Sequence, residues 1–385
     1  FILMSTEPQG IKLPPYPYDR LGPLKQLAVD AHGAVIDLSV GTPCDAPSEA
    51  VLLALAESAE AARTYPPSIG TKQLRCAAAD WFRLRLGIEV PVSQIAACVG
   101  SKEFVAGLPH WLRLRDPSKD TVLYPEVSYP SYAMGALLAG CRAVPVPMDH
   151  HFRLDLGAID PQDAERALCL WSNSPGNPAG GLDDLPAVAA WGRKHQVPIF
   201  SDECYVEFTW DGPAATPGQL PGQSILSSGL DGVVAVHSLS KRSNLAGIRV
   251  GFYAGDAELV SYLSEIRKHT GLMVSGPAQL AAVAALKDSG HVLQQRERYW
   301  SRLGRVSAVL NSIGLHAPLP AGAFYLWVPA TNGDAWGLAE RLATELGVLV
   351  SPGEFYGSRA AGFIRVAVVQ DEDQIAELER RAKNL

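Results

Sequence analysis

Short apolar segments alternate with helical segments between residues 95 and 254, and no other feature limits the possible folds as strongly. The apolar segments predict strands at 95–99, 122–124, 142–146, 168–172, 197–201, 233–236 and 249–254. Helical spacing is clear between them, for example over 185–195. This alternation predicts an α/β fold with a doubly wound, mostly parallel sheet, in which ligands bind beyond the carboxyl ends of the strands.

The chain of 385 residues is long enough for two domains. We expect residues 1–44 to form an N-terminal arm and part of a small domain, 45–275 the large domain, and 276–385 the rest of a smaller α+β domain. In that last part, helices are expected at 278–286, 291–313, 335–346 and 372–383, and strands at 323–328 and 364–368. The small domain is thus expected to use both ends of the chain.

Composition and charge exclude several classes of partner. The net charge is −7 without a long basic block, so nucleic acid is not an expected partner. No apolar span reaches about 18 residues, and we expect a cytoplasmic protein without a membrane segment, with Met4 as its native start. The cysteines are scattered without a C-x-x-C pair, which favours reduced thiols. His150 and His151 are assigned to a solvated loop, and no metal is expected.

The segment 233–255 places a single lysine, Lys241, in a turn of small polar residues between two predicted strands. Loss of hydration and the nearby cation Arg249 should both lower the pKa of Lys241, leaving more of the amine that attacks carbonyl groups. Ser238 and Arg249 supply donors that suit a phosphate monoester. Capture of an aldehyde beside a phosphate site indicates pyridoxal 5'-phosphate (PLP). The alternative is an exposed Lys-Arg pair in a serine-rich loop.

Other polar residues also follow predicted strands. Gly100 precedes Ser101 and Lys102 at the start of a helical segment, where free backbone N–H groups and the helix dipole favour an anion. Asp202 ends the strand 197–201, and two interpretations stay open: a helix cap, or the anion that keeps the pyridine nitrogen of PLP protonated. Asn177 lies in a Pro-Gly-Asn turn after the strand 168–172.

The sequence S-L-S-K at 238–241, followed by L-A-G-x-R-x-G at 245–251, closely resembles the lysine signature of the class I/II (fold type I) PLP-dependent aminotransferases. The resemblance continues in the family's order from Gly41 to Arg365. It implies a transaminase in which Lys241 binds the cofactor and transfers the proton, assisted by Asp202 and Tyr205 of a D-E-x-Y motif. The cofactor contacts that it implies, with Tyr132 as the alternative to Tyr129 for stacking on the ring, are Ser101, Lys102, Tyr129, Asn177, Asp202, Tyr205, Ser238, Lys241 and Arg249.

The same resemblance implies roles toward the substrate and a second subunit. Gly41 should let the backbone approach the substrate, although a turn glycine is equally compatible with the sequence. Arg365, a charge inside an apolar strand, should bind the substrate α-carboxylate near Asn177; the alternative is a salt bridge to a distant acid. Tyr65 should reach the cofactor phosphate of the neighbouring subunit in a homodimer with shared active sites. Its alternative is a partly buried tyrosine packed on the following Pro-Pro turn.

Longer segments, among them S-D-E-C-Y-V-E-F-T-W and Q-Q-R-E-R-Y, look like the actinobacterial-type N-succinyldiaminopimelate aminotransferases. This likeness implies transfer from glutamate to N-succinyl-2-amino-6-oxopimelate in lysine and diaminopimelate biosynthesis, with Arg267, Lys268 and Lys102 as candidate partners of the distal carboxylates. The alternatives are an aspartate- or alanine-type aminotransferase and a PLP-dependent C–S β-lyase. A nicotinamide oxidoreductase is disfavoured because no strand is followed by G-x-G-x-x-G. A non-catalytic regulator is disfavoured because no basic helical domain is appended.

Overall fold

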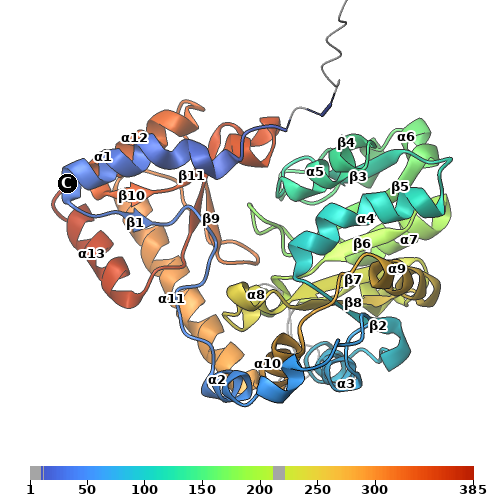
Figure 1. Cartoon of the computed structure of the whole chain (residues 1–385). Helices are drawn as coiled ribbons and strands as arrows, with labels where there is room; N and C mark the ends of the chain where they lie inside the picture. Colours follow the sequence, from blue (N-terminus) through green and yellow to red (C-terminus); the bar gives the residue numbers. More distant parts are fainter. Residues whose placement is uncertain (1–9, 12, 211–221) are drawn as a thin grey trace, which may run out of the picture.

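The computed structural model describes residues 10–11, 13–210 and 222–385, so the expected start at Met4 lies outside the described residues. Two bodies of secondary structure lie side by side in Figure 1. The larger is a seven-stranded sheet with helices around it. The smaller contains both ends of the chain, because α1 (Gly22–His32) packs beside α12 (Ala335–Leu346). This arrangement confirms the predicted α/β fold with a second, smaller α+β unit.

The large sheet has the strand order β2-β8-β7-β6-β5-β3-β4. Neighbouring strands from β7 to β4 are parallel, whereas β8 is antiparallel to both β7 and β2. The strands are β2 (Ile95–Cys98), β3 (Thr121–Pro125), β4 (Arg142–Val146), β5 (Ala167–Asn173), β6 (Ile199–Asp202), β7 (Val233–Ser238) and β8 (Gly251–Gly255). All seven strands predicted from the apolar segments are therefore present, and the mostly parallel sheet is confirmed.

Helices cover both faces of this sheet, as the nearly continuous apolar character of its strands requires. On one face the core includes residues of α4 (Ser101–Arg115), α5 (Ser131–Leu138) and α9 (Ala257–His269). On the other face it includes residues of α3 (Lys72–Trp81), α7 (Leu185–His195) and α10 (Gly276–Lys287). Two shorter helices, α2 (Glu49–Ala56) and α6 (Pro161–Arg166), complete this body. Ser48 caps α2, since its hydroxyl accepts a hydrogen bond from the Val51 N–H at 3.4 Å.

The smaller body is built on the long helix α11 (Ser289–Ser312), with α1, α12 and α13 (Glu372–Ala382) around two small sheets. One sheet is antiparallel, in the order β11 (Ser351–Pro352), β12 (Phe363–Ala367), β9 (Tyr325–Pro329). In the other, β1 (Ile36–Asp37) runs parallel to β10 (Val348–Leu349). The sequence did not predict β10 and β11, because strands of two residues are too short to show alternation.

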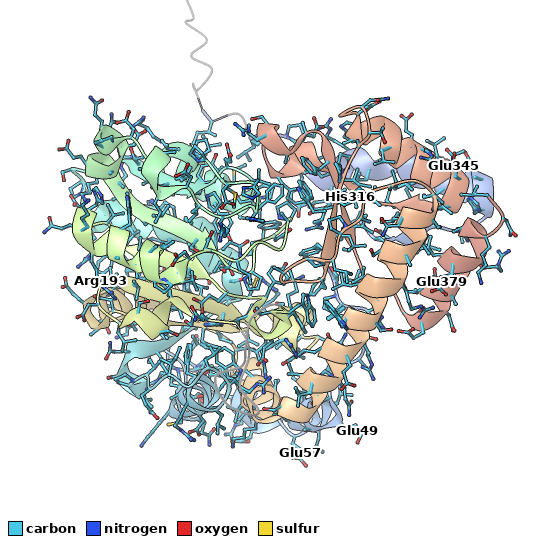
Figure 2. The ribbon with its side chains drawn as sticks, turned by 180° about the vertical axis from the view of Figure 1, so that it is seen from behind. Glu49, Glu57, Arg193, His316, Glu345 and Glu379 are labelled. Atoms are coloured by element: carbon cyan, nitrogen blue, oxygen red, sulfur yellow. The ribbon has the colours of Figure 1, made fainter. Side chains whose placement is uncertain are left out.

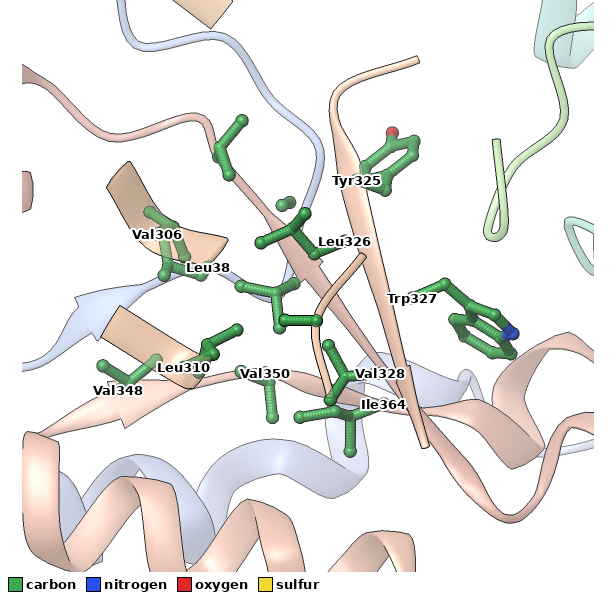
Figure 3. Close-up of a cluster of buried hydrophobic side chains, with 14 of the residues drawn as sticks. Leu38, Val306, Leu310, Tyr325, Leu326, Trp327, Val328, Val348, Val350 and Ile364 are labelled. Atoms are coloured by element: carbon green, nitrogen blue, oxygen red, sulfur yellow. The ribbon is translucent and has the colours of Figure 1, made fainter. Parts of the chain in front are cut away.

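Strand β9 separates the core of the smaller body from the space between the two bodies. Figure 3 shows Leu326 on the same side of β9 as Leu38 and Val306, and all three are buried in one apolar cluster. Tyr325 and Trp327 point to the opposite side of the strand, as the two-residue period of a strand requires. The side chain of Tyr325 is thereby placed where the smaller body faces the large sheet.

The predicted domain boundaries stay a prediction, and the core suggests a change to one of them. Ala278 and Ala282 of α10 lie in the same apolar cluster as α3 and the large sheet. We therefore propose that the second boundary lies between α10 and α11, near Asp288, rather than at 275.

Charged side chains lie on the outside of both bodies, as Arg193 of α7 and Glu345 of α12 show in Figure 2. His150 and His151 lie in an exposed turn, in agreement with the predicted loop. Within residues 10–11, 13–210 and 222–385, no group of three or more His, Cys, Asp or Glu residues is arranged to hold a metal ion. In the same ranges, no helix combines the length and the apolar character that a membrane span needs.

Candidate active site

A cavity of about 260 Å³ opens between the carboxyl ends of the large sheet and the small antiparallel sheet. With the exception of Tyr65 and the distal-carboxylate candidates Arg267 and Lys268, its lining includes the site residues predicted from the sequence. These are Gly41, Ser101, Lys102, Tyr129, Asn177, Asp202, Tyr205, Ser238, Lys241, Arg249 and Arg365. The fold thus brings together residues that are more than 300 positions apart in the sequence.

Lys241 lies in the short helix α8 (Leu239–Arg242), directly after β7. Ser238 caps this helix, because its hydroxyl accepts a hydrogen bond from the Ser240 N–H at 3.1 Å. The Lys241 ammonium donates to the backbone carbonyl of Gly41. Burial lowers the pKa of Lys241 to about 8, and the positive charges of Arg365 and Arg249 act in the same direction. The amine is therefore half neutral near pH 8, as a carbonyl-binding lysine needs.

One end of the cavity has the properties of a phosphate site. Gly100 precedes α4 with a φ of 75°, and no side chain caps the free N–H groups that follow it. The Arg249 guanidinium lies against Gly100, where any Cβ atom would overlap it. Arg249 forms no ion pair with any described residue; its Nη1 donates to the Ala246 carbonyl at 2.7 Å and lies 3.5 Å from the Ser240 hydroxyl. Free amides, hydroxyls and an unpaired guanidinium form an anion site.

An ion pair between the buried Arg267 and the partly buried Glu103 holds this turn in place. Glu103 accepts a hydrogen bond from the Val99 N–H at 3.1 Å, just before Gly100. Arg267 of α9 donates to both oxygens of Glu103, at 2.6 and 2.8 Å. Arg267 is therefore not free to bind a substrate carboxylate, and that prediction is wrong. The prediction for Lys268 is wrong as well, because this residue is exposed and pairs with Glu265 at 2.8 Å.

A carboxylate occupies the opposite side of the cavity. Asp202 ends β6, and its oxygens accept hydrogen bonds from the Tyr132 hydroxyl at 2.9 Å and the Cys204 N–H at 3.2 Å. Burial raises the pKa of Asp202. Among the described residues no cation pairs with it, and the next short helix, Val206–Phe208, is preceded by Tyr205 instead. The cap interpretation is thus wrong, and a buried acid faces the cavity without a cation.

The two tyrosines considered for ring stacking have different surroundings. Tyr129 lines the cavity beside Lys102, whose ammonium lies 5.6 Å from the centre of its ring. Tyr132 is fully buried, and its hydroxyl is used by Asp202. This difference favours Tyr129 for contact with a flat ligand.

Arg365 of β12 lies at the small-sheet end and is 1% exposed. Its two Nη atoms donate to the Asn177 side-chain oxygen at 2.8 Å and to the Ser39 carbonyl at 2.6 Å. The rings of Tyr325 and Tyr356 lie 4.3 and 4.9 Å from its guanidinium carbon. No carboxylate pairs with it in the described part of the chain, so the salt-bridge alternative is wrong. A buried guanidinium without an acid is a ready site for a carboxylate ligand.

Neighbouring polar groups fix the orientation of the residues between the two ends. Because the Asn177 oxygen accepts from Arg365, its NH₂ group remains available as a donor. The Tyr205 hydroxyl lies 2.7 Å from that of Tyr325. Gly41 has no space for a side chain, since a Cβ atom would overlap the Tyr325 hydroxyl. Glycine is therefore required at position 41 because Tyr325 of the small sheet approaches the backbone there.

Sequence reasoning missed three tyrosines that line the cavity, Tyr16, Tyr18 and Tyr325. Tyr16 and Tyr18 come from the arm that precedes α1, and the Tyr18 hydroxyl lies 3.3 Å from Arg365. The Lys102 ammonium lies 5.2 Å from the centre of the Tyr16 ring. The aromatic residues between prolines in P-P-Y-P-Y were the only sequence signal for this contribution.

Tyr65, a predicted cofactor contact, also lies outside the cavity. Its side chain is 92% exposed, so it does not pack on the Pro-Pro turn as the alternative required. The fold does not bring Tyr65 to the cavity of its own chain.

The residues at this site fit PLP. Asp202 is a buried anion without a cation, which suits a protonated pyridine nitrogen, and the Gly100 turn with Arg249 suits a phosphate. Lys241 lines the same cavity with its lowered pKa. The fold and the site together define a PLP-dependent enzyme of fold type I.

Comparison with known proteins identifies the family. Residues 34–381 match the family model described as aminotransferase class I and II, and the chain belongs to this family. It is 39% identical to the 4-dedimethylamino-4-oxo-anhydrotetracycline transaminase OxyQ of Streptomyces rimosus, over 95% of this chain and 98% of that protein. It is 34% identical to an LL-diaminopimelate aminotransferase of Desulforudis audaxviator, over 96% and 95%. The protein is therefore a PLP-dependent transaminase that acts on amino acids and 2-oxo acids.

Solved structures agree with this assignment. An aminotransferase of Neisseria meningitidis has a TM-score of 0.86 and 28% identity, with 97% of both chains covered. A double mutant of the Thermus thermophilus aspartate aminotransferase has a TM-score of 0.83 and 26% identity, with 98% of both chains covered.

Proposed function

We propose that this transaminase takes an amino group from glutamate and passes it to N-succinyl-2-amino-6-oxopimelate, as a succinyldiaminopimelate transaminase. The sequence likeness of several segments to that type of enzyme supports the proposal. Relatives named LL-diaminopimelate aminotransferases support it further, because the acceptor is an acylated form of the same carbon skeleton. The main structural support is Arg365, a buried cation that pairs with no described acid and lines the same cavity as Lys241.

The residues would divide the work as follows. When bound, PLP would supply an aldehyde for the amino group of the donor and an electron-withdrawing ring that stabilises negative charge at its Cα atom. Arg365 binds the α-carboxylate, which fixes the direction of the Cα–H bond. Lys241, as a neutral amine, removes the Cα proton and returns it to the other side of the transferred nitrogen. Asp202 holds the proton on the ring nitrogen, and the Asn177 NH₂ group and Tyr205 hydroxyl donate to the phenolic oxygen.

The proposed acceptor carries more carboxylates than Arg365 can bind. Of the three cations considered from the sequence, only Lys102 lines the cavity without an acidic partner among the described residues. Tyr16 and Tyr129 flank its ammonium, which leaves it charged and open on the cavity side. We assign Lys102 to a distal carboxylate of the substrate.

An aspartate-type aminotransferase is the second candidate, favoured by the likeness to the Thermus thermophilus structure and by this single additional cation. A panel of purified substrates separates the two. We expect the highest kcat/KM with glutamate and the succinylated oxopimelate. A tenfold preference for aspartate and 2-oxoglutarate would instead assign the aspartate type, and release of pyruvate from a thioether amino acid would assign the β-lyase.

We further propose a homodimer in which Tyr65 reaches the phosphate site of the partner chain. In the single chain both Tyr65 and Arg249 are exposed, which supports a site completed by a second copy. Leu52 and Leu53, near Tyr65 in the sequence, are also exposed apolar residues.

Mixed dimers test this proposal. A Lys241→Ala chain combined with a Tyr65→Phe chain should give one site with both changes and one with neither, so that activity exceeds that of both parents. An Asp202→Asn chain combined with Lys241→Ala is the matched control, because Asp202 belongs to its own chain's cavity and no intact site forms. Equal activities of the two mixtures would show that Tyr65 acts in its own subunit.

A further inference from the structure

Asp202 is held by a tyrosine that the sequence assigned to a different role. The Tyr132 hydroxyl donates to one carboxylate oxygen at 2.9 Å, and the Cys204 N–H donates to the other at 3.2 Å. Tyr132 is 1% exposed and Asp202 is 7% exposed. Both oxygens thus accept hydrogen bonds from the protein, which restrain rotation of the carboxylate while it faces the cavity.

The fold leaves little freedom to the Tyr132 hydroxyl. Tyr132 lies in the first turn of α5, which packs closely on α4: a Cβ atom on Gly135 would come within 2.9 Å of the Val105 carbonyl oxygen. The Trp171 ring lies beside the Tyr132 ring, with 5.2 Å between their centres. The hydroxyl is therefore positioned by packing as well as by its hydrogen bond.

A buried carboxylate without a cation tends to take up a proton, and burial indeed raises the pKa of Asp202. Hydrogen bonds from Tyr132 and Cys204 act against this tendency, since they favour the charged form. A protonated Asp202 would not hold a proton on the ring nitrogen of PLP.

We infer that Tyr132 is a positioning residue, which keeps Asp202 ionised and directed at the ring nitrogen of PLP. This inference rests on the role of Asp202 proposed above. The hydroxyl stabilises the charged carboxylate paired with a protonated ring nitrogen, and contributes nothing where the ring has no nitrogen. The ratio of the protein's affinities for a ring with and without the nitrogen atom therefore measures the contribution of the Tyr132 hydroxyl.

The test compares two ligands on the cofactor-free protein: PLP, and its carba analogue in which C–H replaces the ring nitrogen. Both carry the aldehyde and the phosphate, so the ratio of their dissociation constants isolates the ring nitrogen. We expect the wild-type protein to prefer PLP, and Tyr132→Phe to reduce that preference about 10- to 100-fold, the value of one hydrogen bond to a charged group.

Tyr253→Phe is the matched control. Tyr253 is a buried tyrosine of the same apolar cluster, and its hydroxyl has no hydrogen-bond partner among the described residues. This variant loses the same atom and should keep the preference within about twofold of wild type. An unchanged preference in Tyr132→Phe would overturn the inference and leave Tyr132 a purely structural residue.

Asp202→Asn separates this inference from the assignment on which it rests. If Asp202→Asn abolishes the preference, adding Tyr132→Phe to it should have no further effect. If Asp202→Asn keeps the preference, the role of Asp202 itself is wrong. Should Tyr132→Phe fail to fold, difluorotyrosine at position 132 keeps the shape and is a stronger donor, so the preference should rise; no change would again overturn the inference.

Discussion

The two ends of the cavity are built with opposite charges. At the large sheet, Asp202 is a buried anion that no described cation pairs with, held by a hydroxyl and an amide. At the small sheet, Arg365 is a buried cation that no described acid pairs with, held by oxygen atoms and aromatic rings. Each end is therefore complementary to a ligand group of the opposite charge, a pyridinium at one and a carboxylate at the other. The cofactor site is thus marked by an acid without a cation, and the substrate site by a cation without an acid, among the described residues.

Arg267 shows why burial alone does not identify such a site. It is 1% exposed, as Arg365 is, but Glu103 binds it through two hydrogen bonds. The charge of Arg267 is balanced by a carboxylate, whereas Arg365 donates only to neutral oxygen atoms among the described residues. The same residue type at the same burial therefore serves the fold in one place and a ligand in the other.

The largest effect is expected at Lys241, because this residue acts on both the cofactor and the substrate. Lys241→Ala should lower transamination by roughly four orders of magnitude, because it removes the proton-transferring amine. The visible absorbance of the lysine-bound cofactor should disappear while the circular dichroism spectrum is unchanged. Persistence of that absorbance band would show that another residue binds the aldehyde.

A change at the small-sheet end should affect mainly the substrate. Arg365→Gln should lower kcat/KM for the amino donor by about 100- to 1,000-fold, as expected for one partner of a desolvated charge pair, with a much smaller change in the PLP dissociation constant. Steady-state kinetics and a PLP titration measure both. An equal loss of PLP affinity would mean that the two ends are not independent.

The matched change at Arg267 should affect stability and cofactor binding rather than substrate binding. Arg267→Gln leaves the partly buried Glu103 without its partner and should lower the free energy of unfolding by about 2 kcal/mol, the value of a hydrogen bond to a charged group. Because Glu103 also holds the Gly100 turn, PLP affinity should fall, whereas KM for the donor should change little in the loaded enzyme. Denaturant unfolding of both arginine variants makes the comparison direct; a stability loss in Arg365→Gln as large as in Arg267→Gln would contradict it.

The smallest effect concerns the proton of Lys241. Because its pKa is lowered to about 8, the neutral amine should increase about tenfold between about pH 7 and pH 9, and capture of PLP by the cofactor-free protein should accelerate in parallel. Stopped-flow absorbance measures this rate. In Arg365→Gln the midpoint should move to higher pH, since a positive charge that lowers the pKa is removed. A profile that is flat over this range would show that Lys241 is not the attacking group.

The sequence was sufficient where local patterns determine position. Lys241, Asp202 and Ser101 each follow an apolar segment that becomes a strand of one sheet, and strand ends of a mostly parallel sheet meet at one edge. The helices 185–195 and 335–346 were predicted to the residue, because their apolar periodicity and Asp N-caps are local signals.

Contacts between side chains that are far apart in the sequence could not be predicted in the same way. Arg267 pairs with Glu103, which lies in a helix 164 positions away in the sequence, whereas Arg365 pairs with no acid among the described residues. Nothing in the sequence distinguishes these two arginines. Tyr16 and Tyr18 reach the cavity only because the arm packs with the C-terminal half of the chain. The position of Tyr65 toward a second chain stays a prediction for the same reason, since it depends on contacts that a single chain does not contain.

The proximity of Arg365 to Lys241 has a consequence for proton uptake. The guanidinium charge is one of the factors that lower the pKa of Lys241. Any carboxylate that binds Arg365 cancels this repulsion, so the amine becomes more basic and takes up a fraction of a proton from the buffer. By reciprocity, the protonated amine increases the affinity of the cavity for carboxylates. The cofactor-free protein is thus a proton-coupled receptor for organic acids, and its heat of binding should vary with the ionisation enthalpy of the buffer.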